Sequence, residues 1–166
     1  MKAISILLRA IFGGVFIFSG FVKAVDPWGT AYKIEEYIAV FGMNWLTDAI
    51  SFLPITLSIL LSSLEFMIGV LIFFGFFPKL SKYSAAIIMG FFTILTFIDA
   101  LTNKVDDCGC FGDAIKLTNW ETFWKNIVLD VILVGIILLE RKMELSVSKI
   151  NSKLLTSVFG IFIIFF

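Results

Sequence analysis

The chain has two cysteines, and both lie in the short stretch DDCGCFGD, residues 106–113. Cys108 and Cys110 are separated by a single glycine. A disulfide between them is sterically possible, because Cα atoms two residues apart can lie within the distance that such a bond needs. The ring it would close is so small that it would stabilise the folded chain little. A strained, exposed bridge of this kind is typical of disulfides that exchange readily with other thiols.

The neighbours of the two cysteines leave three interpretations open. Three aspartates flank the pair and disfavour a thiolate, although a disulfide here can still be attacked by a partner's thiolate. We favour thiol–disulfide exchange, with Cys108 and Cys110 as the catalytic residues. The pair could instead be inert loop residues, or half of a metal site that another chain completes. Because the chain has no histidine, we expect no four-ligand zinc site within it.

The elements that must position these cysteines are expected to be transmembrane helices. Hydrophobic residues make up 60% of the 166-residue chain, more than a soluble domain of this length could cover. The net charge of zero gives no sign of nucleic-acid binding. Four segments are long and apolar enough to span a lipid bilayer, at about residues 4–22, 54–77, 83–101 and 122–139.

A fifth apolar segment begins near Leu154 and reaches Phe166. It contains about 13 residues, whereas a spanning helix needs about 20. We therefore expect this segment to be the truncated start of a fifth transmembrane helix, and the natural chain to continue beyond it.

The charges of the loops predict the orientation of the chain. Residues 78–83 and 140–153 are mainly basic, whereas residues 23–53 and 101–121 each carry two bases and four acids. Basic loops stay in the cytoplasm. The N-terminus is therefore predicted to be cytoplasmic, and the cysteine loop to face the periplasm across a bacterial inner membrane. On that oxidising face a disulfide can persist.

Two local patterns predict helices on either side of the cysteines. In the first outer loop, Tyr32, Glu35 and Glu36 fall at helical spacing, which predicts a short interfacial helix. This helix could be a structural lid over the bundle or a lid that gates substrate. After the cysteine loop, Thr118 and Glu121 match a capping box, which predicts that the fourth spanning helix begins there.

Charged residues also fall within the predicted spans. Arg9, Glu65 and Asp130 would be costly in lipid, and such residues usually pair inside a bundle. The side chain of Arg9 is long enough to reach toward Glu65, so an internal ion pair that fixes helix register is one interpretation. The other is a proton or quinone-headgroup site with Arg9, Lys23, Glu65 and Asp130 as cofactor-binding residues. Lys23, Asp99 and Asp130 could line a pocket beneath the cysteine loop.

Several motifs together resemble a known family. The first span reads LLRAIFGGVFIFSGFVKAVDP, the second contains LEFMIGVLIFFG, the loop contains DCGCFGD and the fourth span opens with WKN. Over nearly the whole chain to about residue 139, this is similar to the MauE branch of the DoxX-like superfamily. The resemblance implies an all-α, integral membrane four-helix bundle over residues 1–140. Residues 141–166 would then be a cytoplasmic loop and the start of the fifth helix.

The resemblance also implies a redox function. Cys108 and Cys110 match the family's cysteine pair, and Arg9, Lys23 and Glu65 match its polar helix positions. MauE-type proteins are linked to maturation of methylamine dehydrogenase, an enzyme that needs many periplasmic disulfides, and DoxX-type proteins to quinone-linked oxidation. The expected function is therefore thiol–disulfide exchange with a periplasmic thioredoxin-like or other dithiol domain, with a quinone as the candidate cofactor.

Other functions and other partners remain open at this point. The dithiol domain could be the chain's own continuation beyond the fifth helix. A non-catalytic membrane anchor or assembly subunit of a larger complex is the main alternative function, so whether the protein is an enzyme stays open. A small-molecule transporter is disfavoured, because the sequence has few helices and no repeats or broken helices.

Overall fold

The computed structural model describes residues 2–103, 105 and 117–143, which form helices and connecting turns without strands. The helices are α1 (Lys2–Val25), α2 (Pro27–Val40), α3 (Asn44–Ala49), α4 (Leu53–Phe74), α5 (Pro78–Thr102) and α6 (Asn119–Met143). The predicted fifth span and the two cysteines lie outside the described residues.

Four of these helices are long and apolar enough to cross a membrane. The candidate spans are Ala3–Val25, Leu53–Phe74, Pro78–Thr102 and Asn119–Glu140, in α1, α4, α5 and α6. They confirm the four spans predicted from the sequence, so the chain is an all-α, multi-pass membrane protein. Large apolar side chains cover their outer faces, where a bilayer would solvate them, and include Phe18, Ile87, Ile94, Val131 and Leu138.

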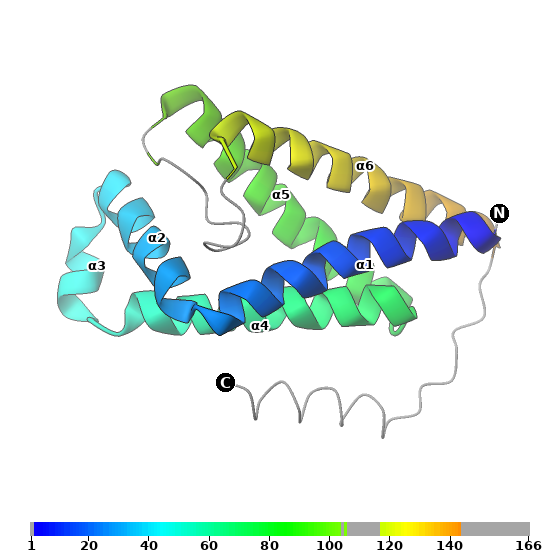
Figure 1. Ribbon diagram of the computed structural model, residues 1–166, viewed down its shortest axis with the longest axis horizontal. Coiled ribbons are helices and arrows are strands. Elements are labelled where there is room, and N and C mark those ends of the chain that lie inside the picture. Colours follow the sequence, from blue (N-terminus) through cyan, green and yellow to red (C-terminus); the bar gives the residue numbers. More distant parts are fainter. Residues whose placement is uncertain (1, 104, 106–116, 144–166) are drawn as a thin grey trace, which may run out of the picture.

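The spanning helices form two antiparallel pairs, α1 with α4 and α5 with α6 (Figure 1). The pairs converge at the end that holds the N-terminus of α1, and they diverge toward the opposite end, where α2 and α3 lie (Figure 1). We call these the narrow end and the wide end. Between the pairs lies an apolar core built from Phe12, Phe16, Ile68, Ile72, Ala85, Met89, Leu129, Leu133 and Ile136.

Helices α1 and α4 come into backbone contact at glycines. A Cβ added to Gly13 would lie 2.8 Å from the carbonyl oxygen of Gly69, and one added to Gly20 would lie 2.6 Å from the backbone nitrogen of Phe66. Both distances are shorter than side-chain carbons tolerate, so the pair can approach this closely only with glycine there. A Cβ added to Gly14, the residue after Gly13, would have no neighbouring atom within 4 Å.

Local signals set where the helices begin and end. The carboxylate of Asp26 accepts a hydrogen bond from the backbone N–H of Gly29 (3.1 Å) and so caps α2. Gly75 has a φ of +73°, a left-handed conformation that favours glycine, and it ends α4. At α6, the Oε2 of Glu121 accepts hydrogen bonds from the backbone N–H (2.9 Å) and the hydroxyl (2.7 Å) of Thr118. The predicted capping box is therefore confirmed.

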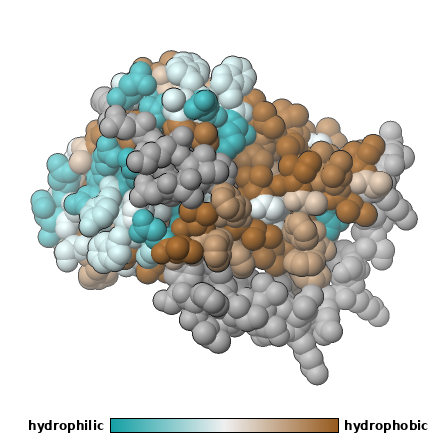
Figure 2. Space-filling model, in the orientation of Figure 1, coloured by the Kyte–Doolittle hydropathy of each residue, from teal (hydrophilic) through white to brown (hydrophobic). Residues whose placement is uncertain are grey.

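The short helix predicted for the first loop is confirmed as α2. It packs against α4 and buries Thr30, Ala31 and Ile38, so it is anchored to the bundle and does not lie only on its surface. Figure 2 shows hydrophilic residues gathered at the wide end and hydrophobic residues over much of the rest of the visible face. This distribution fits a bundle whose wide end reaches the membrane surface.

The glycine contacts predict a position-specific effect on stability. Replacing Gly20 with alanine should lower the free energy of unfolding by about 1–3 kcal/mol, because the methyl group meets the backbone of α4. Replacing Gly14 with alanine should leave it unchanged or raise it by up to about 1 kcal/mol, since alanine favours helix. Denaturation in detergent micelles, followed by circular dichroism, would compare them. Equal stabilities would contradict the proposed contact.

Candidate functional site

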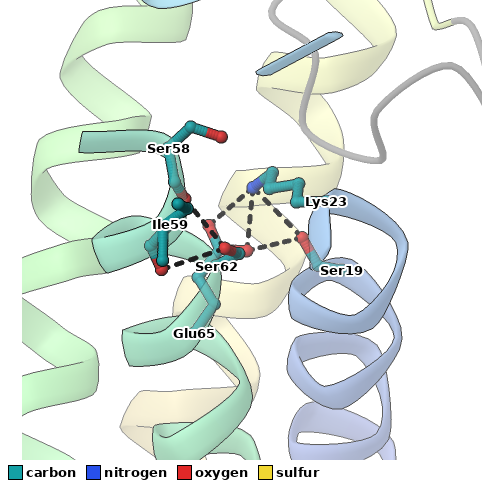
Figure 3. Close-up of polar contacts among 6 residues, drawn as sticks. All are labelled: Ser19, Lys23, Ser58, Ile59, Ser62 and Glu65. Atoms are coloured by element: carbon teal, nitrogen blue, oxygen red, sulfur yellow. Dashed lines mark hydrogen bonds and ion pairs between the residues drawn. The ribbon is translucent and has the colours of Figure 1, made fainter. Parts of the chain in front are cut away.

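A buried ion pair joins α1 to α4 near the middle of the bundle (Figure 3). The ammonium of Lys23 lies 2.7 Å from Oε1 and 2.8 Å from Oε2 of Glu65. Their side chains are only 3% and 4% exposed. The hydroxyl of Ser19 donates to Oε2 of Glu65 (2.8 Å) and accepts from Lys23 (3.3 Å). Every strong polar group of this cluster therefore has a partner, as burial requires.

The direction of helical side chains explains why Lys23 reaches this depth. Lys23 lies in the last turn of α1, and side chains on a helix lean toward its N-terminus. The amine therefore turns back by one helical turn, to the level of Ser19, instead of extending toward the wide end. Figure 3 shows Ser19 and Lys23 directed from α1 toward Glu65 on α4.

Two serine hydroxyls of α4 form hydrogen bonds that lead toward α2. The hydroxyl of Ser62 donates to the backbone carbonyl of Ser58 (2.8 Å). The hydroxyl of Ser58 in turn donates to the backbone carbonyl of Pro27 (2.7 Å), the first residue of α2. These bonds fix the start of α2 against the helix that carries Glu65.

The second helix pair closes the ion pair from the other side. The ammonium of Lys23 lies 5.4 Å from the ring centroid of Phe92 on α5, a cation–π distance. A small cavity of about 20 Å³ touches Lys23, Glu65 and, on α6, Lys125 and Asn126. This volume suits about one water molecule. The ion pair is therefore enclosed by all four spanning helices.

A much larger cavity, of about 660 Å³, opens between α2, α4 and α5. Its volume lies within the usual range of small-molecule sites. Apolar side chains dominate its lining, and the polar exceptions are Lys23, Thr30, Lys33 and Tyr37. The hydroxyl of Tyr37 donates a hydrogen bond to the buried carboxylate of Asp99 on α5. We call this space the wide-end cavity.

Arg9 does not pair with Glu65, which corrects one of the interpretations drawn from the sequence. Its Nε donates to the backbone carbonyl of Ile72 (3.1 Å), and its guanidinium lies 3.5 Å from Oε1 of Glu140. The physical reason is again side-chain direction: Arg9 leans toward the narrow end, away from Glu65. Without a side chain, Gly75 leaves the space that the guanidinium fills.

Glu140 is the centre of a second polar cluster, at the narrow end. Its Oε2 lies 2.6 Å from the ammonium of Lys82 on α5, and its Oε1 accepts a hydrogen bond from Ser5 on α1 (3.5 Å). Together with Arg9, these contacts join all four spanning helices. We call Ser5, Arg9, Lys82 and Glu140 the narrow-end cluster. Glu140 directly precedes Arg141 and Lys142, so the charge pattern of the sequence places it in the adjacent loop and gives no sign of these contacts.

Asp130 also lies apart from the central ion pair. Its Oδ2 accepts a hydrogen bond from the hydroxyl of Thr93 (2.7 Å), which joins α6 to α5. Of the pocket predicted from Lys23, Asp99 and Asp130, only Lys23 lines the wide-end cavity. Asp99 contacts it through Tyr37. The structure thus brings Lys23 and Glu65 together, and places Arg9 and Asp130 elsewhere.

Cys108 and Cys110 lie outside the described residues, but the two ends of their segment meet at the wide end. The side-chain amide of Asn119, the first residue of α6, donates to the backbone carbonyl of Val105 (2.9 Å) and to Oδ1 of Asn103 (3.4 Å). Asn119 therefore holds the start of α6 against the residues that directly follow α5. The described residues on either side of the cysteine segment are thus held together at the end of the bundle where the wide-end cavity lies.

The buried pair predicts strong coupling between two substitutions. Replacing Lys23 alone with methionine should lower the free energy of unfolding by about 3–5 kcal/mol, because Glu65 loses its counter-charge. Adding Glu65→Leu should recover most of that loss. The control is Lys33→Met, which breaks a partly exposed pair with Glu36 (3.4 Å) and should cost less than about 1 kcal/mol. Additive losses in the double variant would contradict the pairing.

Comparison with known proteins identifies the family. Residues 1–139 match the family model described as methylamine utilisation protein MauE. Searches of curated proteins and of solved structures find no match. The matched region covers the four spanning helices up to residue 139, the Lys23–Glu65 pair and both cysteines. The chain therefore belongs to the MauE family of membrane proteins.

Proposed function

We propose that this protein exchanges thiols and disulfides between Cys108–Cys110 and a periplasmic dithiol partner. The observation that carries the proposal is the place of the two cysteines within the matched family region. The bonds of Asn119 support it, because they hold both ends of the cysteine segment at one end of the bundle. A segment whose two flanks are held together can present its cysteines repeatedly to a docking partner.

The exchange balances as two thiol–disulfide steps. A thiolate of the partner attacks one sulfur of the Cys108–Cys110 bridge and forms a mixed disulfide, while the other cysteine leaves as a thiolate. The partner's second thiolate then displaces the first cysteine. The net reaction oxidises the partner's dithiol to a disulfide and reduces the bridge to two thiols. It runs in the opposite sense if the partner is the stronger oxidant.

A lipid-soluble quinone is the proposed redox partner on the membrane side. Two cysteine thiols would give two electrons and two protons to a quinone, which yields the disulfide and the quinol. Support for this step comes from the apolar wide-end cavity and the ionisable groups that border it. The dithiol partner is proposed to be a thioredoxin-like domain, either a separate protein or a continuation of this chain.

The proposed location is the bacterial inner membrane, with the wide end toward the periplasm. The support is the distribution of charge. The start of α5, at the narrow end, carries Lys79 and Lys82, whereas the connecting segments at the wide end carry an excess of acids. Basic loops stay on the cytoplasmic side.

The second candidate function is a non-catalytic membrane anchor or assembly subunit. The observation that favours it is that buried charges of the described spans pair with one another, Lys23 with Glu65 and both Arg9 and Lys82 with Glu140. Ion pairs of this kind can fix helix positions without any chemistry. The two candidates differ in whether the cysteines change redox state.

A redox titration of the cysteines distinguishes the two functions. In native membranes equilibrated with dithiol buffers, we expect a reversible two-electron transition, read by trapping free thiols with a maleimide of defined mass. We expect its midpoint above about −300 mV, since structural disulfides lie below that value. A Cys110→Ser variant should show one reactive thiol at every potential. A bridge that resists reduction, or thiols that never oxidise, would support the anchor.

The orientation can be tested separately by labelling from outside the cell. After reduction, a membrane-impermeant maleimide should label Cys108 and Cys110 in cells with a permeabilised outer membrane. In a Cys108→Ser/Cys110→Ser background, a Lys79→Cys variant should react only after the inner membrane is disrupted. The opposite pattern would reverse the proposed topology.

A further inference from the structure

The narrow end of the bundle carries more positive charge than its buried acid neutralises. Arg9 and Lys82 share the single carboxylate of Glu140, at 3.5 Å and 2.6 Å. Lys79 lies one helical turn before Lys82 on α5, is exposed, and has no ion pair within the described part of the chain. Three cations and one acid therefore meet at this end, and two positive charges have no counter-charge among the described residues.

The exposure of these side chains lets an anion approach the cations first. The side chains of Arg9 and Lys82 are 18% and 16% exposed, whereas that of Glu140 is 8% exposed. An anion at the surface of the narrow-end cluster would therefore meet the guanidinium and the ammonium groups before the carboxylate. Charge-assisted hydrogen bonds from such groups to a phosphate are among the strongest in proteins.

The position of the lysines on α5 adds to this surplus of positive charge. Lys79 and Lys82 lie in the first two turns of the helix. Its first turn holds no acid, and its N-cap residue, Phe77, makes no side-chain hydrogen bond. The N-terminal end of a helix carries a partial positive charge, so cations there are unfavourable and an anion is favourable. A bound anion would stabilise the lysines and the helix end together.

The same part of α5 lies at the depth of the lipid headgroups. With 25 residues, α5 is about 37 Å long, whereas the hydrocarbon core of a bilayer is about 30 Å thick. Its first turns therefore reach the headgroup layer. From there an exposed apolar stripe runs along the helix at helical spacing, through Leu80, Tyr83, Ile87, Phe91, Ile94 and Ile98. Acyl chains of the bilayer would cover this stripe.

We propose that the narrow end binds the phosphate of an anionic phospholipid through Arg9, Lys79 and Lys82. The phosphate supplies the negative charge that the three cations lack, and the acyl chains of the same molecule lie along the apolar stripe of α5. A soluble phosphate would satisfy the charges alone, whereas a phospholipid satisfies both surfaces. In the proposed orientation this lipid belongs to the cytoplasmic leaflet, and its binding does not depend on the proposed thiol–disulfide exchange.

Native mass spectrometry of the whole protein in detergent micelles tests this site. The protein is titrated with phosphatidylglycerol and, separately, with phosphatidylcholine of the same acyl chains, and each titration gives an apparent Kd. We expect phosphatidylglycerol to bind at least about tenfold more tightly, because each surplus charge favours an anionic lipid about fivefold. Equal Kd values would overturn the proposal. So would displacement of the lipid by millimolar glycerol phosphate, which would indicate a site for a soluble phosphate.

Two substitutions that change the charge in opposite directions locate the site. Lys79→Gln removes an exposed charge and should raise the Kd for phosphatidylglycerol about fivefold, whereas Glu140→Gln removes the acid of the narrow-end cluster and should lower it about fivefold. The matched control is Lys33→Gln, which removes the same charge from α2 at the wide end and should keep the Kd within about twofold, because salt screens distant charges. An equal change for Lys79→Gln and Lys33→Gln would mean that the lipid responds to net charge alone, and would overturn the site.

Thermal unfolding in nanodiscs gives a second measure for Glu140→Gln, since this variant leaves Arg9 and Lys82 without their carboxylate. Replacing phosphatidylcholine by phosphatidylglycerol should raise the Tm of Glu140→Gln more than that of the wild type, because the lipid phosphate takes the place of the lost counter-charge. An equal effect of the lipid on the two proteins would contradict a phosphate that contacts these cations.

Discussion

An unpaired charge inside an apolar bundle costs more free energy than most packing contacts return, and Glu65 would be such a charge without Lys23. The pair forms only if α1 and α4 lie close enough for a short salt bridge, and the glycines of their interface permit that approach. Ser19 adds a hydrogen bond to the same carboxylate, and Ser58 of α4 separately bonds to the first residue of α2. Neutralisation of one carboxylate thus fixes α1 against α4, the helix to which α2 is also bonded.

The two helix pairs are connected differently at their two ends. At the narrow end, Glu140 contacts Ser5, Arg9 and Lys82, and these contacts hold the two helix pairs together. At the wide end, α2 is the connection: it contacts α4 through the carbonyl of Pro27 and α5 through Tyr37. The space that remains between α2, α4 and α5 is the wide-end cavity. The same architecture therefore gives one sealed end and one hollow end.

Much of the fold follows from local sequence, and much of the site does not. The four spans, the helix in the first loop and the Thr118–Glu121 capping box were predictable, because each depends on neighbouring residues. Which buried charges pair depends on side-chain direction across helices, so the sequence pattern predicts Glu65 as the partner of Arg9, whereas the structure pairs Arg9 with Glu140. A signal was present: Arg9, Ser19 and Lys23 share one face of α1 with Phe12 and Phe16, at alternating spacings of three and four residues. The surplus charge at the narrow end emerges only from the structure, which shows that Arg9 and Lys82 share one carboxylate.

The arrangement of the helix pairs has a mechanical consequence. The contacts of Glu140 fix the narrow end. A change of the angle between the two helix pairs would therefore rotate one pair against the other about a hinge at that end. A 22-residue helix such as α4 is about 33 Å long. Each degree of rotation would therefore displace its far end by about 0.6 Å while the pivot stays almost still. Motion at the wide end can thus be large without breaking the ion pairs at the narrow end, and it would first change the contacts of α2, which bonds to both helix pairs.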